Sequence, residues 1–329
     1  MPHPNWLTAI FFIMVLTSCS ESPQQADPSF KPKNTVASFA PHHSPTVIVD
    51  NAHNNFLSIT GRYKPFSQVL RSDGFIVRAN TEKFTQKTLS QADVLVIANA
   101  LDKPRKDWLP PYNQALHSDE VTAITDWVAK GGALMLIADH TPFPKVIENL
   151  AQSLGFTFSN GHVKSAIFRK TDRSLTAHIT TYPKEIPTSK NGIAQFSNTQ
   201  SLPFYIQHQS TTKPAYTQVT HVKTFGGSAF TVPKNALSLL NLGRNAISIE
   251  PAIPFQVNAT TPRIAIDGWS QGAVLTLGKG RVAVFSEGMM FSSQRDTTTG
   301  NILGMTSSGA EQNESFLLNI MHWLVDIGV

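Results

Sequence analysis

Cysteine is almost absent from this sequence, because Cys19 is the only one among 329 residues. A single cysteine excludes an internal disulfide and a cysteine-based metal site, and it leaves at most one thiolate nucleophile. If the Cys19 thiol is covalently modified, the chain has no free thiol left and thiolate chemistry is excluded. The fold must then be stabilised by its hydrophobic core, and the chain is long enough for one large domain.

A strong charge of one sign is also missing. The net charge is +5, and charged residues make up 15% of the chain. No run of basic residues interleaved with aromatic residues is present, which is the pattern expected of a nucleic-acid-binding surface. We therefore expect no nucleic-acid partner, and the small positive excess fits a solvated surface near acidic lipid.

The first residues predict export. Residues 6–16 carry no charge and are apolar apart from Thr8, a length that fits the core of a signal peptide and is too short to span a bilayer. The sequence Leu16-Thr17-Ser18-Cys19 follows and resembles the lipobox of bacterial lipoproteins. That resemblance implies a signal peptide over residues 1–18, fatty acyl chains on Cys19 and, with Ser20 next, a periplasm-facing anchor in the outer membrane. The segment before residue 6 has no Lys or Arg, so an ordinary cleaved signal peptide is the alternative.

Residues 19–45 are rich in Pro, Ser, Gln, Lys and Asn and have few large apolar side chains. This composition predicts a disordered tether between the lipid and the folded domain.

From residue 46 onward, short apolar runs alternate with amphipathic segments. Strands are predicted at 46–50, 75–77, 93–98 and 133–138, and helices at 61–73, 118–128 and 144–154. Such alternation indicates a doubly wound, mostly parallel sheet with helices on both faces, in three layers. Residues 160–260 are interpreted as a β-rich insertion, residues 273–286 as a hairpin, and residues 316–324 as a final helix.

Polar side chains follow four of the predicted strands. In an open parallel sheet, ligands bind beyond the carboxyl ends of the strands. Acids, imidazoles and amides gathered there could bind a polar ligand, hold a metal such as Zn, Mn or Fe, or transfer protons. They could equally be helix caps and turn residues. The candidate ligand-binding residues are Asp50, His53, Asn54, Asn99, Asp139, His140 and Glu287.

One motif resembles a hydrolase signature. Residues 268–272 fit G-x-S-x-G around Ser270, and Asp296 and His322 follow in the order used by α/β-hydrolases. That motif requires a helix after the serine, whereas a β pattern follows here. We therefore interpret Ser270 as a turn residue.

Several segments together resemble an uncharacterised bacterial family in the class I glutamine amidotransferase-like superfamily, similar to domains of gliding-type transporter auxiliary proteins. They cover most of residues 46–329 and comprise 49–56, 61–66, 94–99, 137–144, 272–287 and 319–324. The resemblance implies a flavodoxin-like fold and no particular reaction. At the turn where amidotransferases carry their nucleophilic cysteine, this chain has Asp139-His140. Leu57 stands where the resemblance leads us to expect a polar residue, which weakens a metal site near His53.

Two functional classes remain. The first is a non-catalytic binding or accessory domain at the cell envelope, for a saccharide or an envelope protein. The second is a hydrolase that uses the Asp/His/Glu cluster, with or without a metal. The binding domain is favoured because no complete set of nucleophile, base and orienting group can be named. Neither a cofactor nor the oligomeric state follows from the sequence.

The anchor gives the first testable prediction. Cys19→Ala should abolish acyl labelling and membrane fractionation, because the thiol that accepts the lipid is removed, while the folded domain is retained. Metabolic labelling with a fatty-acid analogue measures the first effect and fractionation the second. Undiminished labelling of the variant would contradict the lipoprotein interpretation.

Overall fold

The computed structural model describes residues 23–176 and 218–325. Cys19, the predicted signal peptide and part of the predicted insertion lie outside these residues. Within them, no helix is long and apolar enough to cross a membrane.

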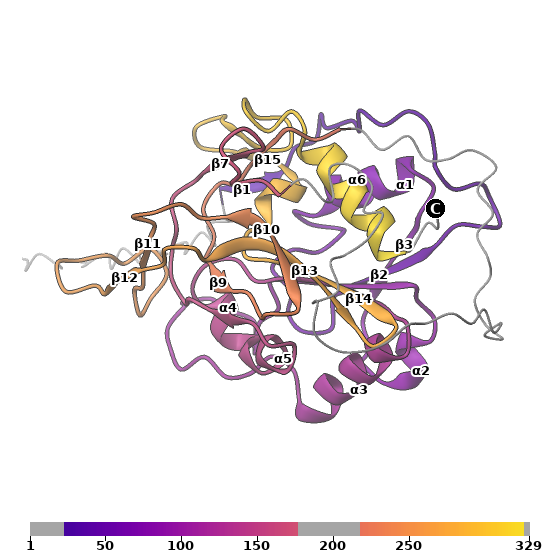
Figure 1. Ribbon diagram of the computed structural model, residues 1–329, viewed down its shortest axis with the longest axis horizontal. Coiled ribbons are helices and arrows are strands. Elements are labelled where there is room, and N and C mark those ends of the chain that lie inside the picture. Colours follow the sequence, from indigo (N-terminus) through magenta and orange to yellow (C-terminus); the bar gives the residue numbers. More distant parts are fainter. Residues whose placement is uncertain (1–22, 177–217, 326–329) are drawn as a thin grey trace, which may run out of the picture.

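The centre of the molecule is one nine-stranded sheet (Figure 1). Its first five strands in space are parallel, which confirms the predicted flavodoxin-like α/β class. The remaining strands pair antiparallel, beginning with the predicted hairpin. In spatial order the strands are β3 (Ile76–Asn80), β2 (Thr46–Asp50), β4 (Val94–Ala98), β5 (Ala133–Ile137), β14 (Gly280–Phe285), β13 (Ser270–Leu277), β9 (Phe230–Thr231) and β6 (Thr157–Phe158), and β10 (Ala236–Asn241) also pairs with β13.

Helices cover both faces of the sheet, as the apolar strands require. Strands β4 and β5 are buried along their whole length, and their alternate side chains enter two separate cores. One core contains the side chains of α1 and α6, and the other contains those of α3 and α5. The helices are α1 (Lys64–Ser72), α2 (Gln86–Leu89), α3 (Ser118–Ala129), α4 (Phe143–Val146), α5 (Glu148–Ser153), α6 (Asn313–Leu324) and the 3₁₀ turn η2 (Met289–Phe291).

The predicted β-rich insertion is only partly a separate unit. Strands β9 and β10 join the central sheet, because β13 offers them an antiparallel edge. Three small sheets lie outside it, and the β11–β12 hairpin projects at the left of Figure 1. They are β1 (Gln24–Ala26) with β15 (Ser293–Asp296) and β16 (Ile302–Gly304), β7 (Ile167–Arg169) with β8 (His221–Lys223), and β11 (Ile247–Ile249) with β12 (Arg263–Ala265).

The described part of the predicted tether, residues 23–45, is packed against the domain, so the expectation of disorder was wrong there. Phe30 and Phe39 are each only 4% exposed, and β1 pairs with β15. Carboxylates of the domain also bind this segment: Glu314 accepts the backbone N–H groups of residues 33 and 34, both at 2.8 Å, and Asp73 accepts the Ser38 hydroxyl at 2.7 Å. The burial of Phe30 and Phe39 and the hydrogen bonds to Glu314 and Asp73 stabilise this segment on the domain, although its composition is mostly polar.

We expect Phe39→Ala to lower the free energy of unfolding by about 3 kcal/mol or more, because a buried ring that contacts Phe75 at 4.6 Å is lost. Val36→Ala is the matched control. Val36 is 75% exposed, so that change should stay within about 0.5 kcal/mol. Urea unfolding of the chain produced without residues 1–18, the predicted signal peptide, measures both. Equal stability of the two variants would mean that this segment is not part of the fold.

Candidate functional site

The carboxyl edge of the parallel strands brings Asp139 and Glu287 together. The register pairs Ile137 of β5 with Phe285 of β14, so each acid stands two residues beyond the last pair of neighbouring parallel strands. Asn99, at the end of β4, accepts the backbone N–H of Asp139 on its side-chain oxygen at 2.9 Å. The end of β4 therefore fixes the backbone of Asp139 at the end of β5, and the Asp139 side chain is half-buried.

Glu287 lies beneath this edge and is 1% exposed. Burial and the charge of Asp139 raise the pKa of Glu287 well above its ordinary value, although backbone N–H donors oppose the shift. Two of those donors, from Met289 and Met290, lie 2.8 and 2.9 Å from the carboxylate oxygens. Glu287 therefore holds the η2 turn in place and is a neutral acid over a wider pH range than an exposed glutamate.

Arg62 supplies a cation beside this pair. Its guanidinium lies 4.3 Å from the centre of the Phe56 ring, and Arg62 itself is half-buried. Burial lowers the pKa of Arg62 to about 10, and the charge of Asp139 opposes that shift. Arg62 therefore stays protonated at neutral pH. The next residue, Tyr63, is buried and donates its hydroxyl to the Gly288 carbonyl at 2.8 Å, which fixes this segment to the end of β14.

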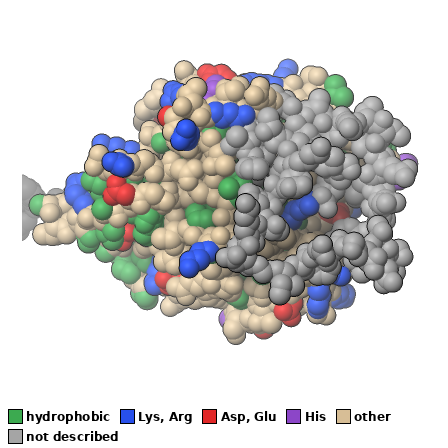
Figure 2. Space-filling model, viewed as in Figure 1, with side chains coloured by type: hydrophobic (Ala, Val, Ile, Leu, Met, Phe, Trp, Pro, Cys, Tyr) green, Lys and Arg blue, Asp and Glu red, His purple; other side chains and the backbone are tan. Residues whose placement is uncertain are grey.

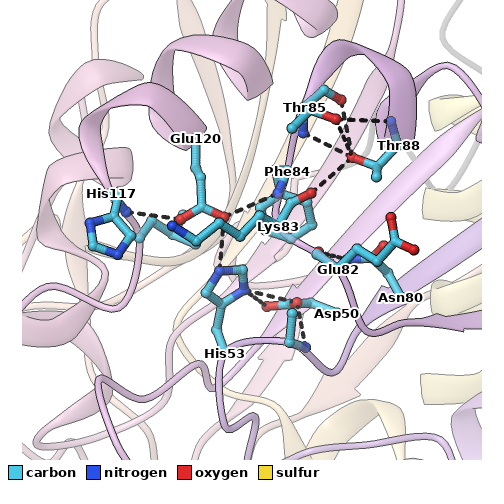
Figure 3. A network of polar contacts seen from close by, with 12 residues as sticks. Asp50, His53, Asn80, Glu82, Lys83, Phe84, Thr85, Thr88, His117 and Glu120 are labelled. Carbon is cyan, nitrogen blue, oxygen red and sulfur yellow. Dashed lines mark hydrogen bonds and ion pairs between the residues drawn. The ribbon is translucent and has the colours of Figure 1, made fainter.

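Asp50 and His53 form a different network from the one predicted (Figure 3). The His53 ring lies between two carboxylates: Nδ1 is 3.0 Å from both oxygens of Asp50, and Nε2 is 3.1 Å from Oε1 of Glu120 on α3. The ring also stacks on Phe84 at 4.9 Å. All three ionisable groups are buried. With both ring nitrogens engaged, His53 has no atom left for a ligand or a metal.

This network does not share its partners with Asp139. Burial lowers the pKa of His53, but the hydrogen bonds and charges of Asp50 and Glu120 outweigh burial and raise the pKa above 6.5. That Asp50, His53, Asp139, His140 and Glu287 face a single cleft stays a prediction, although the hydrogen bonds of His53 run to Asp50 and Glu120 and none to Asp139. Asp50 and His53 connect β2 to α3, whereas Asp139 and Glu287 form the edge described above.

Asn54 and His140 complete the predicted set. Asn54 is exposed, has a φ of +49° and donates its side-chain amide to the Leu101 carbonyl at 3.4 Å, so it shapes a loop. His140 packs its ring on that of His162, with centroids 4.6 Å apart, and on Phe255 at 4.7 Å. Burial and the neighbouring His140 lower the pKa of His162 to about 4, so this second ring is neutral at physiological pH.

Rings continue from His140 towards Arg62. We call this set the aromatic belt, and its neighbouring centroids lie between 4.6 and 6.0 Å apart. Except for Phe143, its members are at least partly exposed. The aromatic belt comprises Phe56, Trp108, Phe143, His140, His162 and Phe255.

The hydrolase motif around Ser270 does not form a catalytic triad. Ser270 is fully buried at the start of β13, where its hydroxyl contacts the Leu240 and Gly272 carbonyls at 3.0 and 2.7 Å. The other two residues of the motif have different partners: His322 pairs with Asp73, and Asp296 accepts a backbone N–H in an exposed turn. Ser270 thus belongs to the sheet rather than to the turn that the sequence suggested.

Within the described residues, no three His, Cys, Asp or Glu side chains are grouped so that they could hold a metal ion. A small hollow with a volume of about 20 Å³ lies beside α4 and α5, and none of the predicted site residues lines it. The edge formed by Asp139, Arg62, Glu287 and the aromatic belt is therefore the candidate site.

No protein-family model matches this sequence, and no curated protein matches it. Solved structures do resemble its fold. The N-terminal domain of mmIFT52 covers 86% of this chain and 100% of its own, with 13% identity and a TM-score of 0.54. Putative ThuA-like proteins from Bacteroides uniformis (10% identity, 91% of this chain and 95% of that one, TM-score 0.44) and Parabacteroides merdae (10%, 85% and 89%, 0.40) are more distant. At these identities the likeness concerns the fold alone.

The His53 network gives a pH-dependent prediction. Because the pKa of His53 is raised, its contribution to stability is fully present below about pH 6.5 and is lost as the pH rises through the folded-state pKa. His53→Gln should therefore destabilise by about 3 kcal/mol under mildly acidic conditions and by less at about pH 9. Urea unfolding at both pH values measures the difference, with the exposed His43→Gln as control. A cost that does not depend on pH would contradict a charged His53.

Proposed function

We propose that this chain is a lipid-anchored cell-envelope protein whose amidotransferase-like domain binds a saccharide at the edge formed by Asp139 and Arg62. In this proposal the domain is an accessory binding module, and Cys19 carries the anchor. At the turn where the resembling amidotransferases carry their catalytic cysteine, this chain has Asp139-His140. This difference supports a domain that has the amidotransferase-like fold but not the glutaminase chemistry.

The observation that carries this proposal is the combination of groups at one edge. Asp139 offers hydrogen-bond acceptors, Arg62 offers donors, and the aromatic belt offers partly exposed rings beside both. A neutral molecule with many hydroxyl groups satisfies all three: its hydroxyls donate to the carboxylate and accept from the guanidinium, and its C–H faces pack on the rings. A ligand with a net charge of one sign would be attracted by one of these two side chains and repelled by the other.

Binding is favoured over hydrolysis by the state of Glu287. Hydrolysis of a glycosidic bond commonly uses two carboxyl groups that both reach the substrate. Glu287 is 1% exposed, and its oxygens already accept backbone N–H groups of the η2 turn. The Asp/His/Glu hydrolase alternative would need Glu287 to leave these donors, and His53 is held between two other carboxylates.

Asp139→Asn should reduce saccharide affinity by about tenfold or more, because hydrogen bonds to a charged acceptor are replaced by weaker ones. Asparagine keeps the oxygen that accepts the His140 N–H at 3.0 Å, so the fold should be retained. Removing the charge next to Glu287 should even leave stability equal or slightly raised. Calorimetric titration with a panel of neutral saccharides measures the affinity, and thermal unfolding measures stability.

The matched control is Asp126→Asn, an exposed acid on α3. It should leave binding unchanged. Equal affinity of wild type and Asp139→Asn would remove Asp139 from the site, and release of reducing sugar by the wild type would favour the hydrolase.

A further inference from the structure

Phe255 is the most unusual member of the aromatic belt, because it is 71% exposed on the long loop of the β11–β12 hairpin. That loop, residues 251–262, contains no charged residue. Figure 2 shows hydrophobic side chains gathered at this end of the molecule. Phe255 shares this hairpin with the exposed Val257 and Ile264, and a group of exposed apolar side chains, unlike a single one, calls for an explanation.

The ring is nevertheless held in place. The imidazoles of His140 and His162 both lie 4.7 Å from it, which fixes it at the edge of the stacked pair. The backbone at Phe255 has a φ of +63°, a conformation that a bulky residue seldom adopts. The loop is also attached to the neighbouring one, because the Tyr112 hydroxyl donates to the Ala252 carbonyl at 2.8 Å. A strained backbone and an ordered ring together indicate a preformed contact surface.

Phe255 also stands next to the proposed site. His140, which it contacts, directly follows Asp139 in the chain, and the belt continues from His140 through Phe143 to Phe56 under the Arg62 guanidinium. A sugar bound at Asp139 and Arg62 would therefore have an ordered aromatic face beyond it, on the side of the β11–β12 hairpin.

We propose that Phe255 is the stacking platform for a further sugar unit, so that the ligand is an oligosaccharide chain rather than a single sugar. This inference rests on the saccharide binding proposed above and adds the chemical class and direction of the ligand. One pyranose meets Asp139 and Arg62, and the C–H face of a following unit packs on the exposed Phe255 ring. Uncharged neighbours in the loop suit such a neutral chain.

The test is calorimetric titration of the mature chain with β-1,4-linked glucose, mannose and N-acetylglucosamine series, each from the monosaccharide to the hexasaccharide. For the series that binds, affinity should rise with length by roughly three- to tenfold, the contribution expected of one aromatic contact. Phe255→Ala should lose most of this increase, so that its loss of affinity is larger for the oligosaccharides than for the monosaccharide, and Phe255→Tyr should keep the increase. Val257→Ala is the control, because Val257 is exposed on the same loop at 48%.

The outcomes separate the two proposals. Wild-type affinity that does not depend on length, or a Phe255→Ala variant that binds every length as tightly as wild type, overturns the platform while saccharide binding stands. The second result would fit a lipid or protein surface as the partner of this loop. An equal loss for mono- and oligosaccharides makes Phe255 a support of the Asp139 site and also overturns it. If no saccharide binds the wild type, both proposals fail.

Discussion

The proximity of Asp139 and Glu287 is the constraint around which the edge of this molecule is built. Their strands, β5 and β14, pair in register inside a sheet whose central strands are apolar on both faces, so polar groups can stand only at the strand ends. Two carboxyl groups that close to each other in a poorly solvated place repel each other. The charge of Arg62 offsets this repulsion at Asp139, and backbone N–H donors offset it at Glu287. Such an arrangement lowers stability, and it is common where a ligand uses it.

The His53 network and the edge formed by Asp139 and Glu287 differ in how far their polar side chains are buried and paired. In the His53 network, each ring nitrogen has a carboxylate, and Glu120 also accepts the N–H groups of Phe84 and His117. A buried network that is fully satisfied rigidifies a fold and offers nothing to a ligand. Asp139 is half-buried, close to an arginine and flanked by partly exposed rings. This contrast is the reason for assigning a structural role to the first network and binding to the second.

Much of the central fold was predictable from the sequence, because its signals are local. Apolar runs mark β2, β4 and β5, and helical spacing marks α1, α3 and α6. The meeting of Asn99, Asp139 and Glu287 follows from the rule that parallel strands end at one edge. The partner of His53 did not follow, because Glu120 lies 67 residues away and looks like an ordinary acid at a helix start. The N-terminal segment was misread for a related reason: its composition is polar, and its acceptor Glu314 is 281 residues further along.

The aromatic belt could not have been found from the sequence, and neither could Arg62. Apart from Phe143, which begins α4, their residues are scattered over loops, and single aromatic side chains there carry no periodic signal. The positive φ angles at Trp108 and Phe255, which turn both backbones at the belt, are visible only in three dimensions. A family resemblance pointed to the segment around Arg62 without giving that residue a role.

The central claim is that a neutral sugar contacts the edge formed by Asp139 and Arg62. The most direct test is backbone amide NMR of the chain without residues 1–18 during titration with the saccharide that binds it most tightly. We expect the largest chemical-shift changes at residues 56, 62, 139, 140, 162 and 255, while the amide signals around Glu120 and in the β1–β15–β16 sheet stay unchanged. Changes centred on the hollow beside α4 and α5, or on the His53 network, would contradict it.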